Sequence, residues 1–67
     1  MTQARLNGER RELPEGSTVA DVVQMLSRGP SGLAVAVNGE VVARSAWSAR
    51  VVEEADEIEV LTAAQGG

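Results

Sequence analysis

The chain has 67 residues, a length that allows one small domain. A domain of about 60 residues buries only about 60% of the surface that its unfolded chain exposes, which leaves little room for a deep catalytic cavity. Cysteine and histidine are both absent, which excludes disulfide bonds, thiolate metal sites and the commonest general base. We therefore do not expect a self-sufficient enzyme.

The net charge is −4, from six arginines and ten acidic residues, and lysine is absent. Residues 51–67 carry five acids and no base, whereas residues 1–50 have a balance of +1. Such an acidic end attracts a basic protein partner and is repelled by nucleic-acid phosphates. No stretch approaches the roughly 20 apolar residues that span a bilayer, and the N-terminal residues lack the apolar run of a signal peptide. We expect a soluble, cytoplasmic protein that binds neither nucleic acid nor membrane.

The first predicted element is a β-hairpin around Asn7-Gly8, because both residues of an Asn-Gly pair tolerate positive φ. It joins a strand around residues 2–6 to a mostly polar strand around 10–13, which has the composition of a sheet edge.

A helix follows, with Thr18 as N-cap and Asp21 completing an approximate capping box. Gly29-Pro30 ends it around residues 27–28. Its apolar stripe, at helical spacing, comprises Val19, Val22, Val23 and Leu26.

A second Asn-Gly pair, Asn38-Gly39, predicts a hairpin between strands around 33–37 and 41–44. The first of these strands is apolar throughout and suits the centre of a sheet. Its larger residues, Leu33, Val35 and Val37, share one face.

A short helical turn is expected next, capped by Ser45 and turning Trp47 inward. Trp47 is the only aromatic residue, and a role in the core is favoured over a role as a docking hot spot. Val51 and Val52 are expected to extend the core. Residues 53–56 then form a polar turn.

The last strand, residues 57–62, places Ile58 and Val60 on one face. The order of hairpin, helix, hairpin and strand predicts an α+β fold of the β-grasp, or ubiquitin-like, type: a mixed sheet of four to five strands with one helix across one face. The closing strand lies parallel to the first, because the helix provides a crossover. Residues 1–62 form the expected domain, and residues 63–67 a flexible tail.

The terminal Gly66-Gly67 is the candidate reactive group. Without side chains, a Gly-Gly end can enter a narrow slot and present its carboxylate. Joining that carboxylate to AMP makes a mixed anhydride that a sulfur nucleophile can attack, which gives a thiocarboxylate. The pair alone is weak support, because a terminal Gly-Gly arises by chance in roughly one protein in two hundred at average glycine usage.

The chain resembles the ThiS family of sulfur carriers in thiamin thiazole biosynthesis. The resemblance runs from about Met1 to Gly67 and rests on residues 35–42, on Arg44 and Trp47, on residues 56–58 and on the Gly-Gly end. Family members usually have Gly-Asp before the last strand, where this chain has Ala55-Asp56. A positive φ at Ala55 would cost roughly 1 kcal/mol.

The resemblance implies a cycle of partners and no bound cofactor or metal. A ThiF-like adenylyltransferase uses ATP to adenylate Gly67, a cysteine desulfurase is the ultimate sulfur source, and a ThiG-like thiazole synthase accepts the sulfur. Gly66, Gln65, Ala64 and Ala63 form the arm that enters partner active sites.

The acidic residues before the tail favour a solvated face over a metal site. We expect Glu57, Glu59 and Leu61 to take part in docking, so that charge reversal at Glu57 and Glu59 slows association at low salt. Three alternatives stay open: a MoaD-like carrier for molybdopterin or another sulfur metabolite, a ubiquitin-like protein modifier, and a β-grasp interaction module with an inert tail.

Overall fold

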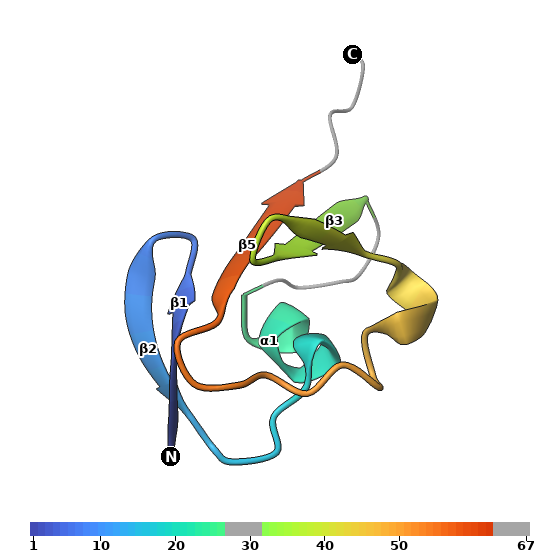
Figure 1. The fold of residues 1–67 in the computed structure, drawn as a ribbon. Helices are drawn as coiled ribbons and strands as arrows, with labels where there is room; N and C mark the ends of the chain where they lie inside the picture. The colour runs from blue at the N-terminus through green and yellow to red at the C-terminus, as the bar shows by residue number, and fades with distance from the viewer. Residues whose placement is uncertain (27–31, 63–67) are drawn as a thin grey trace.

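The computed structural model describes residues 1–26 and 32–62. Figure 1 shows the elements in the order that the sequence predicts. They are β1 (Thr2–Leu6), β2 (Glu9–Leu13), α1 (Val19–Leu26), β3 (Leu33–Val37), β4 (Glu40–Val42), the 3₁₀ helix η1 (Arg44–Ala46) and β5 (Glu57–Thr62).

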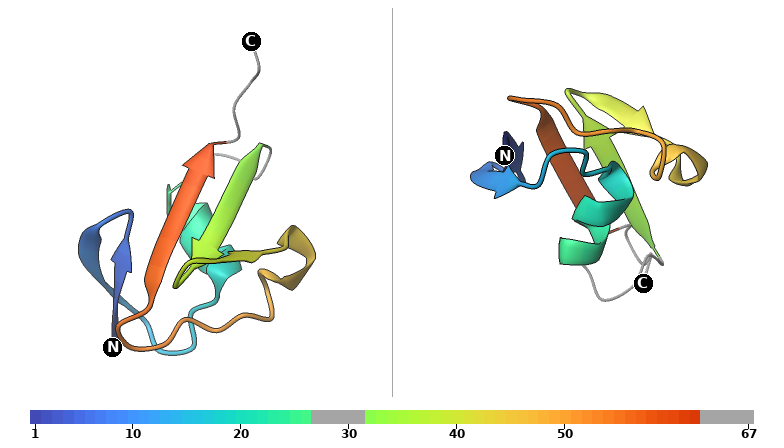
Figure 2. Two further views of the ribbon diagram at one scale, coloured as in Figure 1. Left: turned by 45° about the horizontal axis from the view of Figure 1, so that its top comes forward. Right: turned by 90° about the horizontal axis from the view of Figure 1, so that it is seen from below.

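The strands form one mixed sheet in the order β2-β1-β5-β3-β4. β5 pairs in parallel with β1, through Arg5 opposite Glu57 and Leu6 opposite Ile58, and antiparallel with β3. Helix α1 lies across one face of the sheet, and no other helix or strand of residues 1–26 and 32–62 covers the opposite face (Figure 2). This arrangement confirms the predicted β-grasp fold, the edge position of β2 and the parallel closing strand.

Both hairpins turn at their Asn-Gly pair with positive φ at both residues. The φ angles are 52° and 87° at Asn7 and Gly8, and 52° and 85° at Asn38 and Gly39, which is the twist that two-residue hairpins favour. β4 ends at Val42, shorter than the predicted strand, because the chain enters η1 at Arg44.

The N-terminus of α1 has the predicted reciprocal cap. The Thr18 hydroxyl oxygen accepts a hydrogen bond from the Asp21 N–H at 3.3 Å, and an Asp21 carboxylate oxygen accepts one from the Thr18 N–H at 3.0 Å. These two bonds pair N–H groups that the first helical turn leaves without partners. The predicted helix end at residues 27–28, with Gly29-Pro30, lies outside the described residues.

The core lies between α1 and the sheet. Val19, Val22 and Val23 of the helix are buried, and Leu26 is half-buried against them. The buried hydrophobic residues that the sheet and its connections add to this core are Ala4, Leu6, Leu13, Val35, Val37, Trp47, Val52 and Ile58.

Trp47 belongs to this core, as predicted. Its side chain is 5% exposed, and its indole N–H donates a hydrogen bond to the Val42 carbonyl at 2.9 Å. The Arg44 guanidinium lies 5.7 Å from the centre of the indole ring and covers it on one side. The Arg44 and Trp47 pattern of the sequence is therefore a packing motif.

Two local predictions are wrong. Ser45 lies inside η1 and does not cap it, since Ala43 holds the N-cap position without a side-chain hydrogen bond. Val51 is 45% exposed, whereas Val52 is buried. The cause is the isolated β-bridge between Val51 and Thr18, because consecutive residues of an extended segment point to opposite sides.

Candidate functional site

The candidate site is the end of β5 and the outer sheet face around it. β5 is a central strand, paired with β3 from Leu33 opposite Thr62 to Val37 opposite Ile58. The strand that leads to the C-terminus is thus held on both sides. The predicted reactive residue and arm lie outside the described residues, so their roles stay predictions: Gly67, Gly66, Gln65, Ala64 and Ala63.

The side chain of Asn7 holds β5 beyond the last β1–β5 pair. Its carboxamide nitrogen donates to the Val60 carbonyl at 3.3 Å, and its oxygen accepts from the Val60 N–H at 2.9 Å. The amide therefore replaces the backbone of a neighbouring strand where β1 has already turned away. The Asn-Gly pattern predicts the turn, but it carries no sign of this second role.

The side chain of Asn38 likewise forms a hydrogen bond with the backbone at the start of β5. Its side-chain oxygen accepts from the Glu57 N–H at 3.0 Å, and its nitrogen donates to Asp56 at 2.9 Å. The Asn38 backbone N–H also donates to the Glu57 carbonyl at 2.7 Å. Both hairpin asparagines thus fix β5 from opposite sides.

The turn before β5 contains the alanine that the sequence marks as unusual. Ala55 has a φ of 70°, in the left-handed region that favours glycine, as expected for a position where glycine is usual. Its N–H donates to the Gln3 carbonyl at 2.7 Å, and the Gln3 N–H donates to the Glu54 carboxylate at 3.0 Å. These bonds to β1 keep the backbone of the turn in this conformation.

The prediction that the acidic residues before the tail are solvated is wrong for Asp56. This residue is buried, at 6% exposure, and its carboxylate accepts from the Glu53 N–H at 2.8 Å. The same carboxylate accepts the Asn38 amide and lies 3.5 Å from the Arg50 guanidinium. Asp56 thus links the turn, the second hairpin and the segment after η1, a structural role that charge counting along the sequence misses.

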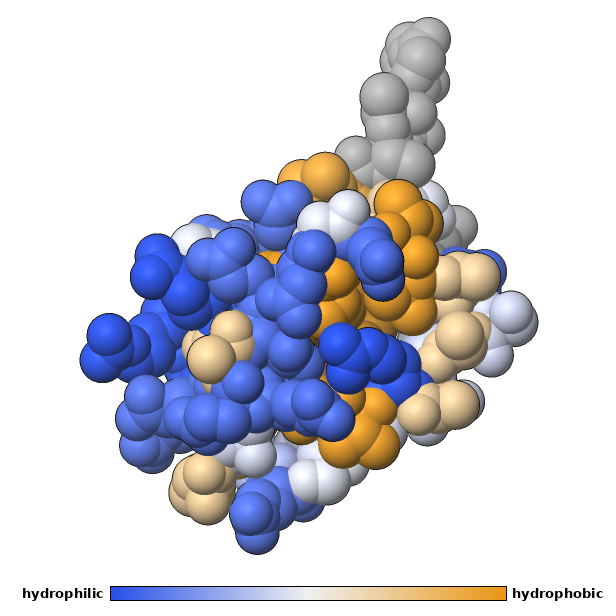
Figure 3. Space-filling view, in the orientation of Figure 1, coloured by the Kyte–Doolittle hydropathy of each residue, from blue (hydrophilic) through white to orange (hydrophobic). Residues whose placement is uncertain are grey.

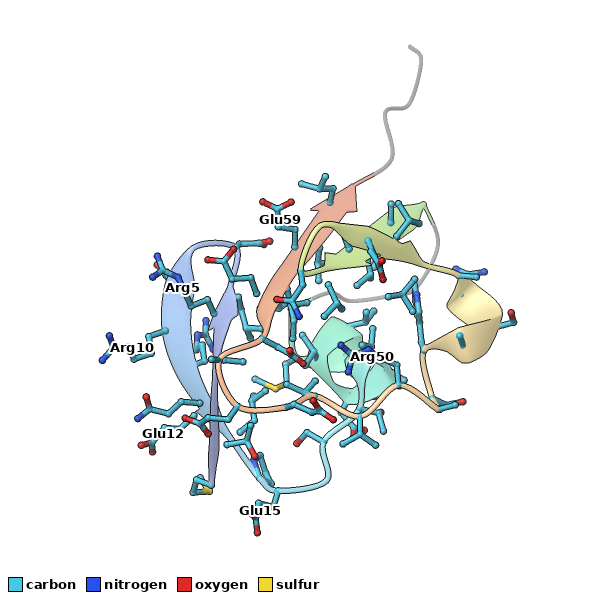
Figure 4. The ribbon with its side chains drawn as sticks, viewed as in Figure 1. Arg5, Arg10, Glu12, Glu15, Arg50 and Glu59 are labelled. Carbon is cyan, nitrogen blue, oxygen red and sulfur yellow. The ribbon has the colours of Figure 1, made fainter. Side chains whose placement is uncertain are left out.

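The outer face of β5 carries the three predicted docking residues. Glu57, Glu59 and Leu61 alternate with Ile58 and Val60, which face the core. All three are exposed, Leu61 by 58%. Figure 4 shows Glu59 pointing away from α1, near the end of β5.

The rest of this face divides into two halves. Figure 3 shows mostly hydrophilic residues over β1 and β2, and apolar areas interrupted by hydrophilic residues over the part formed by β3, β4 and β5. The register explains the apolar half, since Leu61 lies opposite Ala34 and Glu59 opposite Ala36, with Val41 of β4 next in the row. Val41 is 82% exposed and Leu61 58%, so both contribute exposed apolar surface to this half of the face.

The described part of the chain contains neither a carboxylate metal site nor a membrane-spanning helix. Residues 1–26 and 32–62 hold no group of three or more carboxylates placed to bind a metal ion. Nor does any helix within these ranges have the length and apolar character needed to cross a membrane.

Comparison with known proteins identifies the family. A model of the ThiS family matches residues 4–67. The sulfur carrier protein ThiS of Escherichia coli (strain K12) is 28% identical over 65 residues, which cover 97% of this chain and 98% of that protein. The crystal structure of the thiamine biosynthesis protein ThiS from Geobacter metallireducens superposes with a TM-score of 0.81 at 28% identity, covering 98% of this chain and all of that one. With a family match that includes the Gly-Gly end and a shared β-grasp fold, this chain belongs to the ThiS family.

Proposed function

We propose that the chain is a sulfur carrier, a protein co-substrate and not an enzyme, that delivers sulfur for thiamin thiazole formation. The observation that carries the proposal is the family match over residues 4–67, which includes Gly66 and Gly67. The fold supports it, because β5 is held in the centre of the sheet and ends five residues before the C-terminus.

The proposed reaction uses the Gly67 carboxylate. A ThiF-like adenylyltransferase transfers AMP from ATP to this carboxylate and releases pyrophosphate. A sulfur nucleophile at the oxidation level of sulfide then attacks the carbonyl carbon and displaces AMP, which leaves a thiocarboxylate. A cysteine desulfurase is the ultimate source of this sulfur, which leaves that enzyme as a persulfide and reaches the sulfide level when thiols reduce it and form a disulfide. A ThiG-like thiazole synthase is the acceptor.

In this reaction the chain itself presents the Gly67 carboxylate to the active site of its partner. Gly66 has no side chain to obstruct entry into a narrow active site, and Ala63, Ala64 and Gln65 provide the reach. The domain contributes a rigid support for this arm, so that binding the domain places the terminus in the partner. ATP is a substrate of the partner, and the carrier itself needs no cofactor.

Intact mass spectrometry tests the proposal. The chain is incubated with the adenylyltransferase, ATP and a sulfur source, beside a known carrier that proves the mixture competent. A mass increase equal to one oxygen replaced by one sulfur is expected. Conjugates of higher mass would instead indicate a protein modifier, and an unchanged mass an inert module.

Two further measurements complete the test. Deletion of Gly67 is expected to abolish the mass change while leaving the unfolding temperature unaltered; retained turnover would contradict the role of the terminus. Addition of a thiazole synthase and its other substrates is expected to regenerate the carboxylate with formation of thiazole. If only a molybdopterin synthase consumes the thiocarboxylate, the MoaD-like alternative is correct.

A further inference from the structure

The two acidic residues on the outer face of β5 differ in a way that their sequence spacing hides. Glu57 lies opposite Arg5 of β1, and its carboxylate is 3.7 Å from the Arg5 guanidinium. Both side chains are more than half exposed, so the pair adds little stability. Even so, it places a positive charge directly beside Glu57 and largely cancels its field.

Glu59 has no such neighbour. Within residues 1–26 and 32–62, its carboxylate takes part in no ion pair and no side-chain hydrogen bond. On one side it lies opposite Ala36, with Val41 beyond, and Leu61 is the next outward residue along β5. Among the described residues, Glu59 is therefore a carboxylate without an ionic partner, and apolar side chains lie on its β3 side and at Leu61.

We propose that Glu59, and not Glu57, is the charge that selects the docking partner, and that the partner presents an arginine or lysine within an apolar surface. The inference rests on the proposed function and takes the adenylyltransferase as the occupant of this face. A surface that covers Val41 and Leu61 also removes water from Glu59. An unpaired carboxylate in that setting is costly, so only a partner with a matching cation binds well.

The position of this face fits the same occupant. Leu61 is the penultimate residue of β5, and the carboxyl terminus is six residues further on. A partner that covers this face therefore lies within reach of the terminus that it has to adenylate, since six extended residues span at most about 20 Å. Glu57 begins the strand at its other end, opposite Arg5 of β1, and is already paired with that arginine.

Isothermal titration of full-length variants with the purified adenylyltransferase tests the inference. Glu59→Gln is expected to weaken binding by about tenfold or more, because the partner's cation loses its counter-charge on burial. Glu57→Gln is expected to change binding by about twofold or less. Glu15→Gln is the matched control, since Glu15 is an exposed acid on the loop after β2, at the opposite end of the molecule from Glu59 (Figure 4). Unfolding temperatures of all variants show that the fold is retained.

The outcomes separate this inference from the proposed function. The inference is overturned if Glu59→Gln binds as well as Glu15→Gln, if Glu57→Gln weakens binding as much as Glu59→Gln, or if the wild-type chain does not bind. Thiocarboxylate formation is measured on the same samples at saturating enzyme. Binding without thiocarboxylate contradicts the proposed function alone, whereas thiocarboxylate formation with equal binding of all variants contradicts the docking inference alone.

Discussion

Replacement of Ala55 by glycine is expected to stabilise the protein. Ala55 is exposed and has a φ of 70°, so its methyl group contributes little burial and occupies an unfavourable backbone region. The hydrogen bond from its N–H to the Gln3 carbonyl involves only backbone atoms, so the substitution leaves it intact. The change therefore isolates the conformational cost of the side chain.

The magnitude follows from two opposing terms. A left-handed conformation costs a residue with a side chain about 1–2 kcal/mol. Glycine removes that cost. However, glycine gives the unfolded chain more conformational freedom, which lowers the free energy of unfolding by about 0.5–1 kcal/mol. The expected net gain in the free energy of unfolding for Ala55→Gly is about 0.75 kcal/mol, and for a domain of this size that raises the unfolding temperature by roughly 3–6 °C.

Urea unfolding followed by Trp47 fluorescence, together with calorimetry, measures this gain. Ala34→Gly is the matched control, because Ala34 is also exposed but lies in β3 without a positive φ. The control is expected to lose about 0.5–1 kcal/mol. If Ala55→Gly destabilises the protein as the control does, the turn is not strained and the reasoning from its φ angle is wrong.

Three other substitutions test the contacts around β5 and the core. Asn7→Gly keeps the turn but removes the side-chain bonds to Val60; we expect a loss of about 1 kcal/mol and faster hydrogen exchange of the Val60 amide, and unchanged exchange would contradict the role of Asn7. Asp56→Ala removes the acceptor shared by the turn and the second hairpin, and a loss of about 2 kcal/mol by urea unfolding is expected; a loss below that of a surface substitution would show the network to be dispensable. Trp47→Ala is expected to cost about 3–5 kcal/mol, measured by far-UV circular dichroism because the substitution removes the fluorophore, and a small effect would place Trp47 outside the core.

The sequence predicts the elements well because their signals are local. Each Asn-Gly pair specifies a turn by its own backbone preference, and Thr18 with Asp21 specifies a helix start three residues apart. The element order then leaves few ways to bury one helix stripe and one sheet face together, so the β-grasp fold follows from it.

The Ser45 error is local, since the short helix begins earlier than predicted, whereas the errors at Val51 and Asp56 concern residues whose environment depends on distant parts of the chain. As an apolar residue, Val51 is expected in the core, but its β-bridge to Thr18 turns its side chain outward. As an acidic residue, Asp56 is expected to face solvent, but it contacts Arg50, Asn38 and the Glu53 N–H. The contacts that decide the two environments, from Thr18 to Val51 and from Asn38 to Asp56, join residues far apart in the sequence.

The sequence by itself determined the turns, the helix cap, the small size of the core and a C-terminus without side-chain bulk, because each depends on residue type and short spacing. Only the tertiary structure decided which of the outward-facing glutamates of β5 has an ionic partner. Glu57 and Glu59 are equivalent in spacing and both point outward. The parallel pairing of β5 with β1 brings Arg5 to one of them, and the antiparallel pairing with β3 places apolar side chains beside the other.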